Sequence, residues 1–419
     1  MTVASDILIC LIALIAIAGV IIRPFALPEA LWPLIGAALL VLLRLLQPSD
    51  ALTGVTKGID VYLFLAGMLL LSEVAREEGL FEWLAALAAK HSRGSATRLF
   101  ALIYVVGVGV TIFLSNDATA VVLTPAVAAV ARSARAERPL PYLLVCAFIA
   151  NAASFVLPIS NPANLVIYGT HLPPLLQWLP RYTLPSLLSI IATFIVLRLT
   201  QQRALLQSIA TDVPVPRLSL SGMTAAVGIA VTALLLLTAS ALSVPLGAPT
   251  AFAGAATALV VLTRERKWPW KTLGSISWGV IPLVAGLFVM VQALDKVGVI
   301  LALSRLLQRQ SAEAPLRTAL ASGLSIAGAC NLMNNLPAGL LVGSAVQRAQ
   351  PPDALMRAVL IGVDLGPNFS VTGSLATILW LSALRREGLR IGAVEFLKLG
   401  LLVTPPALLL ALASSMLVR

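Results

Sequence analysis

The chain has 419 residues, of which 59% are hydrophobic and 11% charged, and its 29 basic and 18 acidic residues give a net charge of +11. Ordinary soluble domains are roughly a quarter charged, and a mean hydropathy of +0.96 leaves too few polar residues to cover a water-facing surface. The composition therefore excludes a soluble enzyme and predicts a protein embedded in the lipid bilayer. Because the basic residues lie mainly between apolar segments, their excess is typical of cytoplasmic loops and not of nucleic-acid binding.

Eight uninterrupted stretches approach the length of about 20 mainly apolar residues that a helix needs to cross the bilayer. These predicted spans are Ile7–Ile22, Leu27–Leu46, Ile59–Ala75, Thr183–Thr200, Met223–Leu242, Leu246–Thr263, Ser277–Leu294 and Ala393–Leu417. The first is interpreted as a span and not as a signal peptide, because no basic residue precedes it and no cleavage pattern follows it. Two amphipathic stretches, Leu80–Lys90 and Val297–Arg309, are expected to lie along the membrane surface.

Four further apolar segments are interrupted by polar residues near their centres. The interruptions are Ser115-Asn116-Asp117 in Leu99–Ala131, Pro158–Pro162 in Pro141–Thr170, Asn331–Asn335 in Pro315–Ala349, and Asp364–Asn368 in Ala354–Leu384. Backbone groups released by a broken helix are costly in hydrocarbon, so such breaks survive only where protein or a water-filled cavity surrounds them. The four breaks therefore predict one shared site near the membrane midplane.

Two breaks fall in each half of the chain, in the same order and after three clean spans, which indicates an internal duplication. We predict a first repeat over residues 1–200, a polar linker over 201–220 and a second repeat over 221–419. Leu99–Ala131 and Pro315–Ala349 are long enough for re-entrant hairpins, which leaves five crossings and one hairpin in each half. An odd number of crossings inverts the second half, as in secondary transporters. The predicted fold is an all-α polytopic membrane protein with two inverted repeats.

The distribution of basic residues predicts which face of this layout is cytoplasmic. On one face the loops hold 18 basic residues, on the other they hold ten, and Lys398 lies within a span. The positive-inside rule then predicts that the richer face is cytoplasmic, in the cell (inner) membrane, and that both termini lie outside. The alternative of twelve full crossings separates the charges less well.

The breaks hold the candidate site residues. Asp117 and Asp364 are the acids most deeply set in apolar sequence, where desolvation favours the protonated carboxyl. Each is a candidate proton carrier, and the alternative is that each caps a half-helix. Neutral amides and hydroxyls suit an uncharged polyhydroxyl ligand or, through their oxygens, a cation. The candidate ligand-binding residues are Ser115, Asn116, Thr119, Ser160, Asn161, Asn164, Asn334 and Asn335.

The three cysteines are far apart and predict neither a disulfide framework nor a zinc site. Only Cys330 lies beside a break, where its thiol is a candidate ligand for a soft metalloid, with a packed small residue as the ordinary alternative. The chain lacks a G-x-x-x-x-G-K-[ST] motif, so a gradient or a partner must supply energy. No cofactor is expected, and the aspartates lack the Tyr-Asp and Gly-x-Gly-Asp signatures of a membrane protease.

Together these motifs resemble the arsenite efflux permease (ArsB) family over essentially the whole chain. The likeness rests on Ser115-Asn116-Asp117 with Thr124-Pro125, on Ser160 to Asn164, on Asn334 to Pro337, on Asp364 to Pro367 and on Gly373 to Thr377. It implies a transporter of the ion transporter superfamily, not an enzyme, that exports arsenite and antimonite. The energy would come from a proton gradient alone or from a soluble arsenite-stimulated ATPase as partner. Arsenite is the uncharged As(OH)3 at neutral pH, which suits amides and hydroxyls.

The sequence differs from some relatives of that family at Asn151, where they have Asp, and at Val363, where they have Cys. The first difference leaves Asp117 as the stronger proton carrier, and the second indicates that a thiolate at position 363 is not required. A sodium-proton antiporter or a sodium-coupled dicarboxylate carrier of the same superfamily is the alternative, because the Ser160-Asn161 break is similar to sodium-binding breaks in those carriers.

Overall fold

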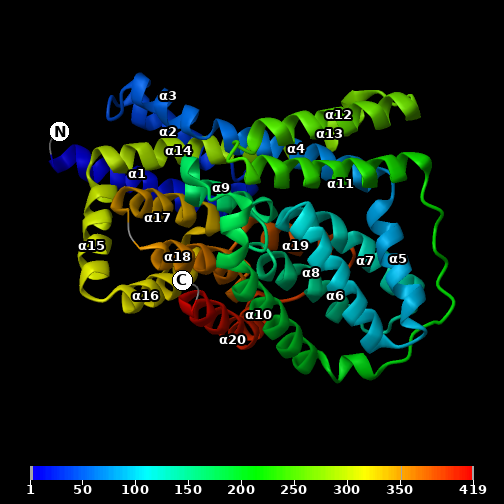
Figure 1. Cartoon of the computed structure of the whole chain (residues 1–419). Helices are drawn as coiled ribbons and strands as arrows, with labels where there is room; N and C mark the ends of the chain where they lie inside the picture. Colours follow the sequence, from blue (N-terminus) through cyan, green and yellow to red (C-terminus); the bar gives the residue numbers. More distant parts are fainter. Residues whose placement is uncertain (1–2, 351, 418–419) are drawn as a thin grey trace.

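The computed structural model describes residues 3–350 and 352–417 and is helical throughout, apart from loops and one isolated β-bridge between Ser95 and Ser208 (Figure 1). Helices are expected because apolar segments in lipid must satisfy their backbone groups internally. The first half contains α1 (Val3–Ile22), α2 (Leu31–Leu42), α3 (Pro48–Lys57), α4 (Ile59–Glu77), α5 (Leu80–Ser92), α6 (Ala96–Phe113), α7 (Thr124–Ser133), α8 (Leu140–Ala152), α9 (Pro162–Tyr168) and α10 (Leu175–Gln201).

The second half repeats this order of long, short and broken helices. It contains α11 (Leu220–Ala241), α12 (Gly247–Glu265), α13 (Pro269–Ser275), α14 (Val280–Lys296), α15 (Val299–Glu313), α16 (Pro315–Met333), α17 (Asn335–Ala349), α18 (Asp353–Leu365), α19 (Leu375–Arg386) and α20 (Ala393–Leu417). Short 3-10 or π turns lie at Pro24–Ala26, Ala118–Leu123, Pro158–Ser160, Gly169–His171, Ala204–Leu206 and Gly366–Phe369.

Among the described residues, five helices are long and apolar enough to cross a membrane, namely α1, α6, α10, α11 and α20. Two bent pairs raise this number to seven, because α3 meets α4 at 48° and α13 meets α14 at 49°. The predicted spans at the positions of α1, α10, α11 and α20 are thus confirmed. The chain ends, predicted to lie outside the cell, are residues 1–2 and 418–419 and lie outside the described part.

The predicted span Leu27–Leu46 is shorter in the structure, where α2 covers only Leu31–Leu42. The chain leaves the helix in a left-handed turn at Arg44, and Pro48 then begins α3. Proline fits the first turn of a helix because its missing N–H is not needed there. This segment is therefore a short helix followed by a bent pair instead of one straight crossing.

Both predicted hairpins consist of two helices joined at a polar tip. Residues 114–117 join α6 to the π-helical segment Ala118–Leu123, which continues into α7, and α16 and α17 meet at Asn334. The amphipathic helix before each hairpin packs against both of its legs, α5 against α6 and α7, and α15 against α16 and α17. Both legs therefore end beside the same surface helix, which is the geometry of a hairpin that enters and leaves on one face.

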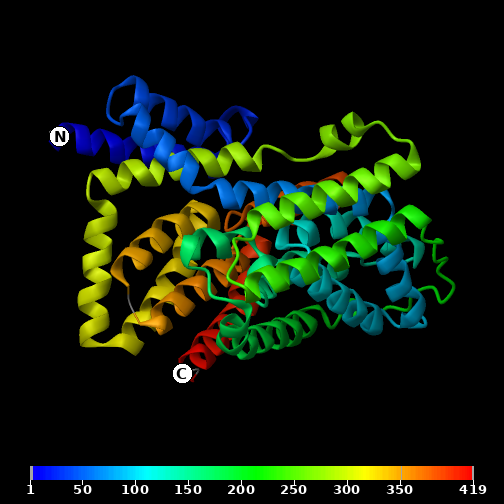
Figure 2. The same ribbon diagram turned by 45° about the horizontal axis from the view of Figure 1, so that its top comes forward.

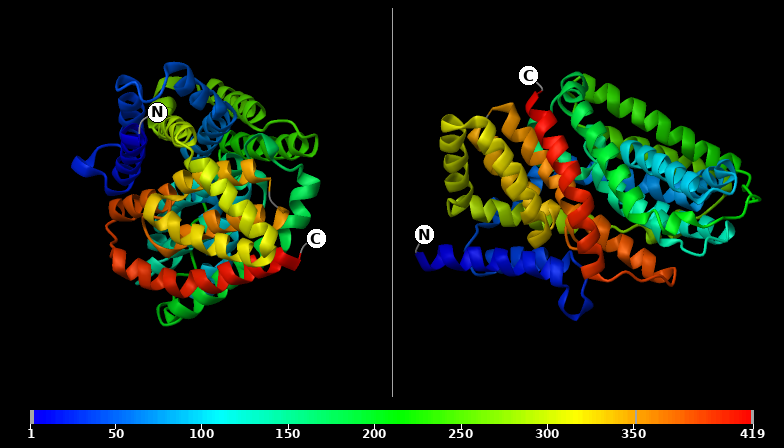
Figure 3. Two further views of the ribbon diagram at one scale, coloured as in Figure 1. Left: turned by 90° about the vertical axis from the view of Figure 1, so that its left-hand side faces the viewer. Right: turned by 90° about the horizontal axis from the view of Figure 1, so that it is seen from below.

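The helices form two layers (Figures 1 and 2), with α1 to α4 and α11 to α14 above the hairpins and broken helices. Figure 1 shows α5 and α15 at opposite ends of the molecule, with α6 and α7 toward the end of α5 and α16 and α17 toward the end of α15. In Figure 3, α10 in green and α20 in red run side by side, and they form one of the largest helix contacts. Two repeats of opposite orientation would give this arrangement, and the boundaries of 1–200 and 221–419 stay a prediction.

The upper layer is held by a close approach of α4 and α12, the most extensive helix contact in the molecule. A Cβ added at Gly67 would lie 2.2 Å from the Thr250 carbonyl oxygen, and one added at Gly254 would lie 2.5 Å from the Gly67 carbonyl oxygen. Small residues let helix backbones approach closely in membranes, where packing replaces the hydrophobic effect as the force between helices. The absence of side chains at these two positions therefore sets the spacing of the layer.

Replacing Gly254 with leucine should lower the unfolding temperature of the detergent-solubilised protein, because the new side chain collides with the backbone of α4. Overpacking of this kind costs roughly 1–3 kcal/mol. Gly109→Leu on α6 is the matched control, since a Cβ there meets nothing within 4 Å. Thermal unfolding followed by tryptophan fluorescence compares the two, and equal unfolding temperatures would contradict the close packing of α4 and α12.

Candidate functional site

One small cavity, which we call the central cavity, is lined by residues of three of the predicted polar breaks, whereas the fourth, Asp364–Asn368, does not reach it and the start of α19 takes its place. Its volume of about 10 Å³ holds about one water molecule. Two apolar residues from the upper layer, Leu65 on α4 and Val280 on α14, complete its wall. The first three breaks contribute Asn116 and Asp117, Asn161 and Pro162, and Asn335 and Leu336, and the start of α19 contributes Ser374, Leu375 and Ala376.

Four helical segments start at the central cavity, and a polar side chain caps each start. The oxygen atoms of these side chains accept hydrogen bonds from backbone N–H groups two or three residues further on. The pairs are Ser115 Oγ with Ala118 N at 3.2 Å, Asn161 Oδ1 with Ala163 N at 3.0 Å, Asn334 Oδ1 with Leu336 N at 3.4 Å, and Ser374 Oγ with Thr377 N at 3.0 Å. Four helix N-termini, each partially positive, thus converge on one point, an arrangement that favours anions and oxygen-rich ligands over cations.

Asp117 is the acid that faces the central cavity. Its carboxylate makes no hydrogen bond or ion pair within the described chain, and Ser115 provides the cap of the helix that follows. The capping alternative for Asp117 is therefore not what the structure contains. A carboxyl group in this place is free to contact a ligand or to carry a proton.

Asp364 lies behind the cavity wall and is fully buried. Asn161 Nδ2 donates a hydrogen bond to Asp364 Oδ1 at 2.7 Å, while Asp364 Oδ2 has no hydrogen-bond partner among the described residues. Asp364 belongs to the last turn of α18 and caps no helix N-terminus. It fixes the amide of Asn161, a cavity-lining side chain that belongs to the other half of the chain.

The side chain of Asn335 differs from those of the other asparagines at the cavity. Its backbone N–H donates to the Gly373 carbonyl at 2.9 Å, but its amide group makes no hydrogen bond within the described chain. Asn116 and Asn161 instead use their Oδ1 atoms to accept backbone N–H groups. Asn335 therefore presents an uncommitted donor and acceptor to the cavity.

Five sequence-predicted residues hold the backbone of the breaks and do not line the cavity, and the first of them is the cap Ser115 described above. Thr119 Oγ1 bonds Thr111 Oγ1 at 2.8 Å, and Ser160 Oγ donates to the Ile112 carbonyl at 3.1 Å. Asn164 Nδ2 donates to the Ser154 carbonyl at 3.0 Å. Asn334 is the cap described above and has a positive φ of 72°. Their polar groups satisfy carbonyls and amides that the interrupted helices release.

Cys330 is buried on α16 with its Sγ 3.9 Å from the Val363 carbonyl oxygen, and it does not line the central cavity. The described residues contain no group of three or more His, Cys, Asp and Glu side chains placed to hold a metal ion. The thiol is packed between α16 and α18, and cavity access to it would require these helices to move.

Asn151, at the position where some relatives have Asp, takes part in a neutral pair. Its Nδ2 donates to Asn368 Oδ1 at 2.9 Å, and Asn368 Nδ2 donates to the Phe148 carbonyl at 2.9 Å. Both side chains are buried, and together they tie α8 to the turn after α18. An amide at this position makes the contact without a second buried charge beside Asp364.

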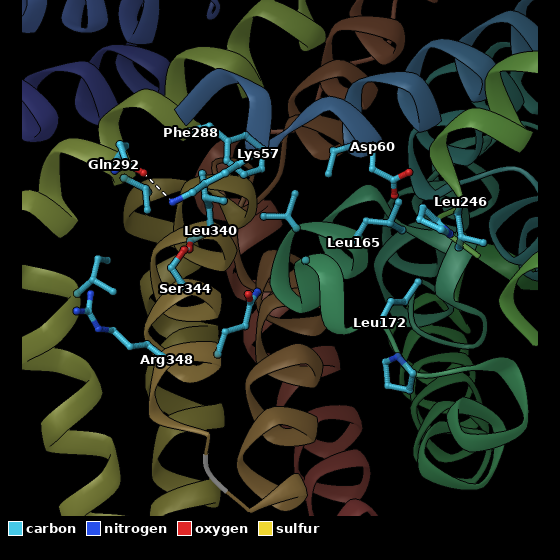
Figure 4. A pocket seen from close by; sticks show the side chains of 18 of the residues that line it. Lys57, Asp60, Leu165, Leu172, Leu246, Phe288, Gln292, Leu340, Ser344 and Arg348 are labelled. Carbon is cyan, nitrogen blue, oxygen red and sulfur yellow. Dashed lines mark hydrogen bonds between the residues drawn. The ribbon is translucent and has the colours of Figure 1, made fainter. Parts of the chain in front are cut away.

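Sequence reasoning missed Ser374, which both caps α19 and lines the central cavity. A serine followed by an apolar helical run is a recognisable N-cap signal, but nothing local to it indicates which side faces a cavity. It also missed a second, larger cavity of about 580 Å³ (Figure 4). This cavity, which we call the vestibule, includes Ile300 of α15 in its wall.

Polar side chains line the outer part of the vestibule. Lys57 Nζ donates to Gln292 Oε1 at 2.7 Å, as the dashed line in Figure 4 indicates. Arg348 forms an ion pair with Asp295 at 2.5 Å. Asp60 Oδ1 accepts from the Gly247 N–H at 2.7 Å, where α12 begins. The vestibule wall is thus lined by two cations and two carboxylates and carries little net charge.

Known proteins resemble the chain over most of its length. The arsenical pump membrane protein of Escherichia coli strain K12 is 27% identical over 365 residues, which are 83% of each chain. An uncharacterized transporter of Mycobacterium tuberculosis is 28% identical over 404 residues, or 90% of this chain and 91% of that one. The resemblance to arsenite permeases read from the motifs is thereby confirmed.

Two solved transporters share the fold. The YdaH transporter of Alcanivorax borkumensis superposes with a TM-score of 0.56 at 17% identity over 88% of this chain and 86% of its own. MtrF of Neisseria gonorrhoeae gives 0.53 at 13% identity over 88% and 82%. Residues 8–362 also match the family described as citrate transporter (CitMHS). These helices, broken around a common cavity, are those of a multi-pass membrane transporter, and the chain belongs to the citrate transporter family.

Proposed function

We propose that this protein exports trivalent arsenite and antimonite from the cytoplasm across the cell membrane in exchange for protons. The observation that carries the proposal is the central cavity, in which four capped helix N-termini and three amide side chains surround one unpaired carboxyl group. The likeness to an arsenical pump membrane protein over 83% of both chains supports the choice of cargo.

The chemistry of the cavity suits a small hydroxylated cargo. As(OH)3 is uncharged at neutral pH and has three hydroxyl groups that both donate and accept hydrogen bonds. Backbone N–H groups at the helix starts can donate to its oxygens, and the amide of Asn335 and the carboxylate of Asp117 can accept from its hydroxyls. A cavity of about 10 Å³ has room for about one water molecule. The cargo would therefore bind in a conformation in which the same cavity is wider.

Asp117 is the proposed coupling group. An uncharged cargo cannot balance a buried carboxylate, so the empty carrier would return with Asp117 neutralised by a proton from outside. Proton and cargo then occupy the site in alternation. Each cycle moves one positive charge inward, which a membrane potential drives with ~2.3 kcal/mol per 100 mV. Asp364, with its unpartnered oxygen behind Asn161, is the alternative coupling group.

A carrier of carboxylate anions is the second candidate function. Two observations favour it, namely the match to the citrate transporter family and the four helix N-termini that would stabilise an anion. The sodium-coupled form of such a carrier, like a sodium-proton antiporter, would bind a cation, for which the amide and hydroxyl oxygens of the breaks are the candidate ligands. An energy-supplying ATPase partner is a separate possibility that purified protein tests directly.

The decisive experiment measures flux in proteoliposomes that contain only this protein. We expect arsenite to accumulate when a proton gradient is imposed and not when a sodium gradient is imposed. Citrate and succinate should neither accumulate nor inhibit. Accumulation of a dicarboxylate with sodium would establish the second candidate, and arsenite movement that appears only with an added ATPase would replace the proton-driven mechanism.

Asp117→Asn should abolish accumulation of arsenite against its gradient while leaving equilibrium binding largely intact, because the amide keeps the size of the side chain but carries no exchangeable charge. Asp212→Asn, on the exposed linker, is the matched control and should pump normally. If the Asp117 variant still pumped uphill with a proton gradient as the sole energy source, coupling would have to be assigned to Asp364.

Asn335→Ala should weaken arsenite binding by about fivefold, the effect of losing one hydrogen bond of roughly 1 kcal/mol, with little change in unfolding temperature. Asn331→Ala is the contrasting variant. Its Nδ2 donates to the carbonyls of Ala327 and Gly366, so its loss should lower stability more than affinity. Binding isotherms and thermal unfolding of both proteins separate the two effects, and unchanged affinity in the Asn335 variant would remove it from the site.

Cys330→Ser should preserve export, because the thiol lies outside the central cavity and As(OH)3 can be held by hydrogen bonds alone. Arsenite efflux from cells, normalised to membrane protein abundance, is the measurement, with Cys146→Ser as a second buried cysteine for comparison. Loss of export in the Cys330 variant at normal abundance would restore the thiol as a metalloid ligand.

A further inference from the structure

The vestibule and the central cavity lie on one line along α17. Leu336 lines the central cavity, Leu340 lines the vestibule, and Ser344 and Arg348 continue the vestibule wall. These positions are spaced by four residues and therefore share one face of the helix. Because a helix rises 1.5 Å per residue, about 6 Å of α17 separates the two cavities.

The same order recurs on two other helices that belong to different parts of the chain. On α4, Leu65 lines the central cavity and Val61 the vestibule, with Lys57 further out at the end of α3. On α9, Pro162 lines the central cavity and Leu165 the vestibule. On each of these three helices, a residue that lines the central cavity lies within one turn of a residue that lines the vestibule. The vestibule therefore lies directly above the central cavity.

The layer between the two cavities is apolar and closed. Leu65, Leu165 and Leu340 are each 3% exposed and Leu336 is 9% exposed. In Figure 4, Leu165 on α9 and Leu340 on α17 both reach into the vestibule, while Lys57, Ser344 and Arg348 lie around it. Polar groups therefore line the outer part of the vestibule, and the residues that line the two cavities one helical turn apart, Leu65, Leu165, Leu336 and Leu340, carry hydrocarbon side chains.

We propose that the vestibule is the mouth through which cargo leaves the central cavity and that Leu65, Leu165, Leu336 and Leu340 form its gate. A layer of leucines one helical turn thick excludes water and hydrated ions when closed, as hydrophobic constrictions do in channels. The polar wall beyond it, with Lys57, Gln292 and Ser344, offers hydrogen bonds to a small hydroxylated solute as it takes up water. The identity of that solute rests on the proposed function, but the gate itself does not.

The gate is tested by thiol accessibility, which does not require transport. In a variant whose native cysteines are replaced by serine, Ala376→Cys places a thiol on the wall of the central cavity. The probe is a charged, membrane-impermeant methanethiosulfonate reagent added to sealed vesicles. Lys57→Cys in the vestibule marks the face from which the reagent arrives. We expect the cysteine at 376 to react slowly from this face, and at least about tenfold faster when Leu340→Ala removes packing from the gate.

Leu324→Ala on α16, where the side chain is 43% exposed, is the matched leucine control and should not change the rate. If the Leu340 variant fails to give a single peak in size-exclusion chromatography, Leu165→Ala on α9 is the alternative variant that removes packing from the gate. Equal rates with and without the gate substitutions, or reaction of the cysteine at 376 only from the face opposite Lys57→Cys, would overturn the proposal. A failed arsenite flux assay with an intact gate response would instead contradict the proposed cargo alone.

Discussion

The structure depends on one constraint, which is that a peptide group without a hydrogen-bond partner is too costly to leave in hydrocarbon. Four helices are interrupted in the middle of apolar segments, and each interruption releases backbone donors and acceptors. Ser115, Asn161, Asn334 and Ser374 satisfy the new helix starts. The four interruptions cost the least free energy when they share one centre that is shielded from lipid. The central cavity is therefore a consequence of where the broken helices can be tolerated.

The second layer of the molecule gives that centre a fixed wall. α4 and α12 approach so closely at Gly67 and Gly254 that their backbones are nearly in contact, and α4 supplies Leu65 to the central cavity. The hairpins pack on surface helices α5 and α15 at opposite ends of the molecule (Figure 1). One closely packed pair of helices thus lies beside two hairpins that approach the centre from opposite ends. This arrangement is compatible with alternating access, in which one cavity opens to each membrane face in turn.

Neutral amides replace charges at several positions of the centre. Asn151 and Asn368 form a pair without charge, and Asn161 separates Asp364 from the cavity. Removing several ions from water costs more than their interactions usually return, whereas hydrogen-bonded amides cost little. Two acids remain at the centre. Asp117 faces the cavity, and Asp364, whose Oδ2 has no partner among the described residues, lies behind Asn161.

The amino-acid pattern is enough to predict which segments are helical, where most of them break and that two amphipathic helices occupy matching places, because each apolar segment in lipid must satisfy its backbone locally. It also placed Asp117, Asn161 and Asn335 in the breaks that meet at the cavity. The packing of distant helices was needed to show that Asn164 and Thr119 donate to backbone carbonyls, that Asp364 holds Asn161 from 203 positions away, and that a vestibule lies above the central cavity. In irregular backbone the direction of a side chain is set by the packing of distant helices, and no local pattern encodes that packing.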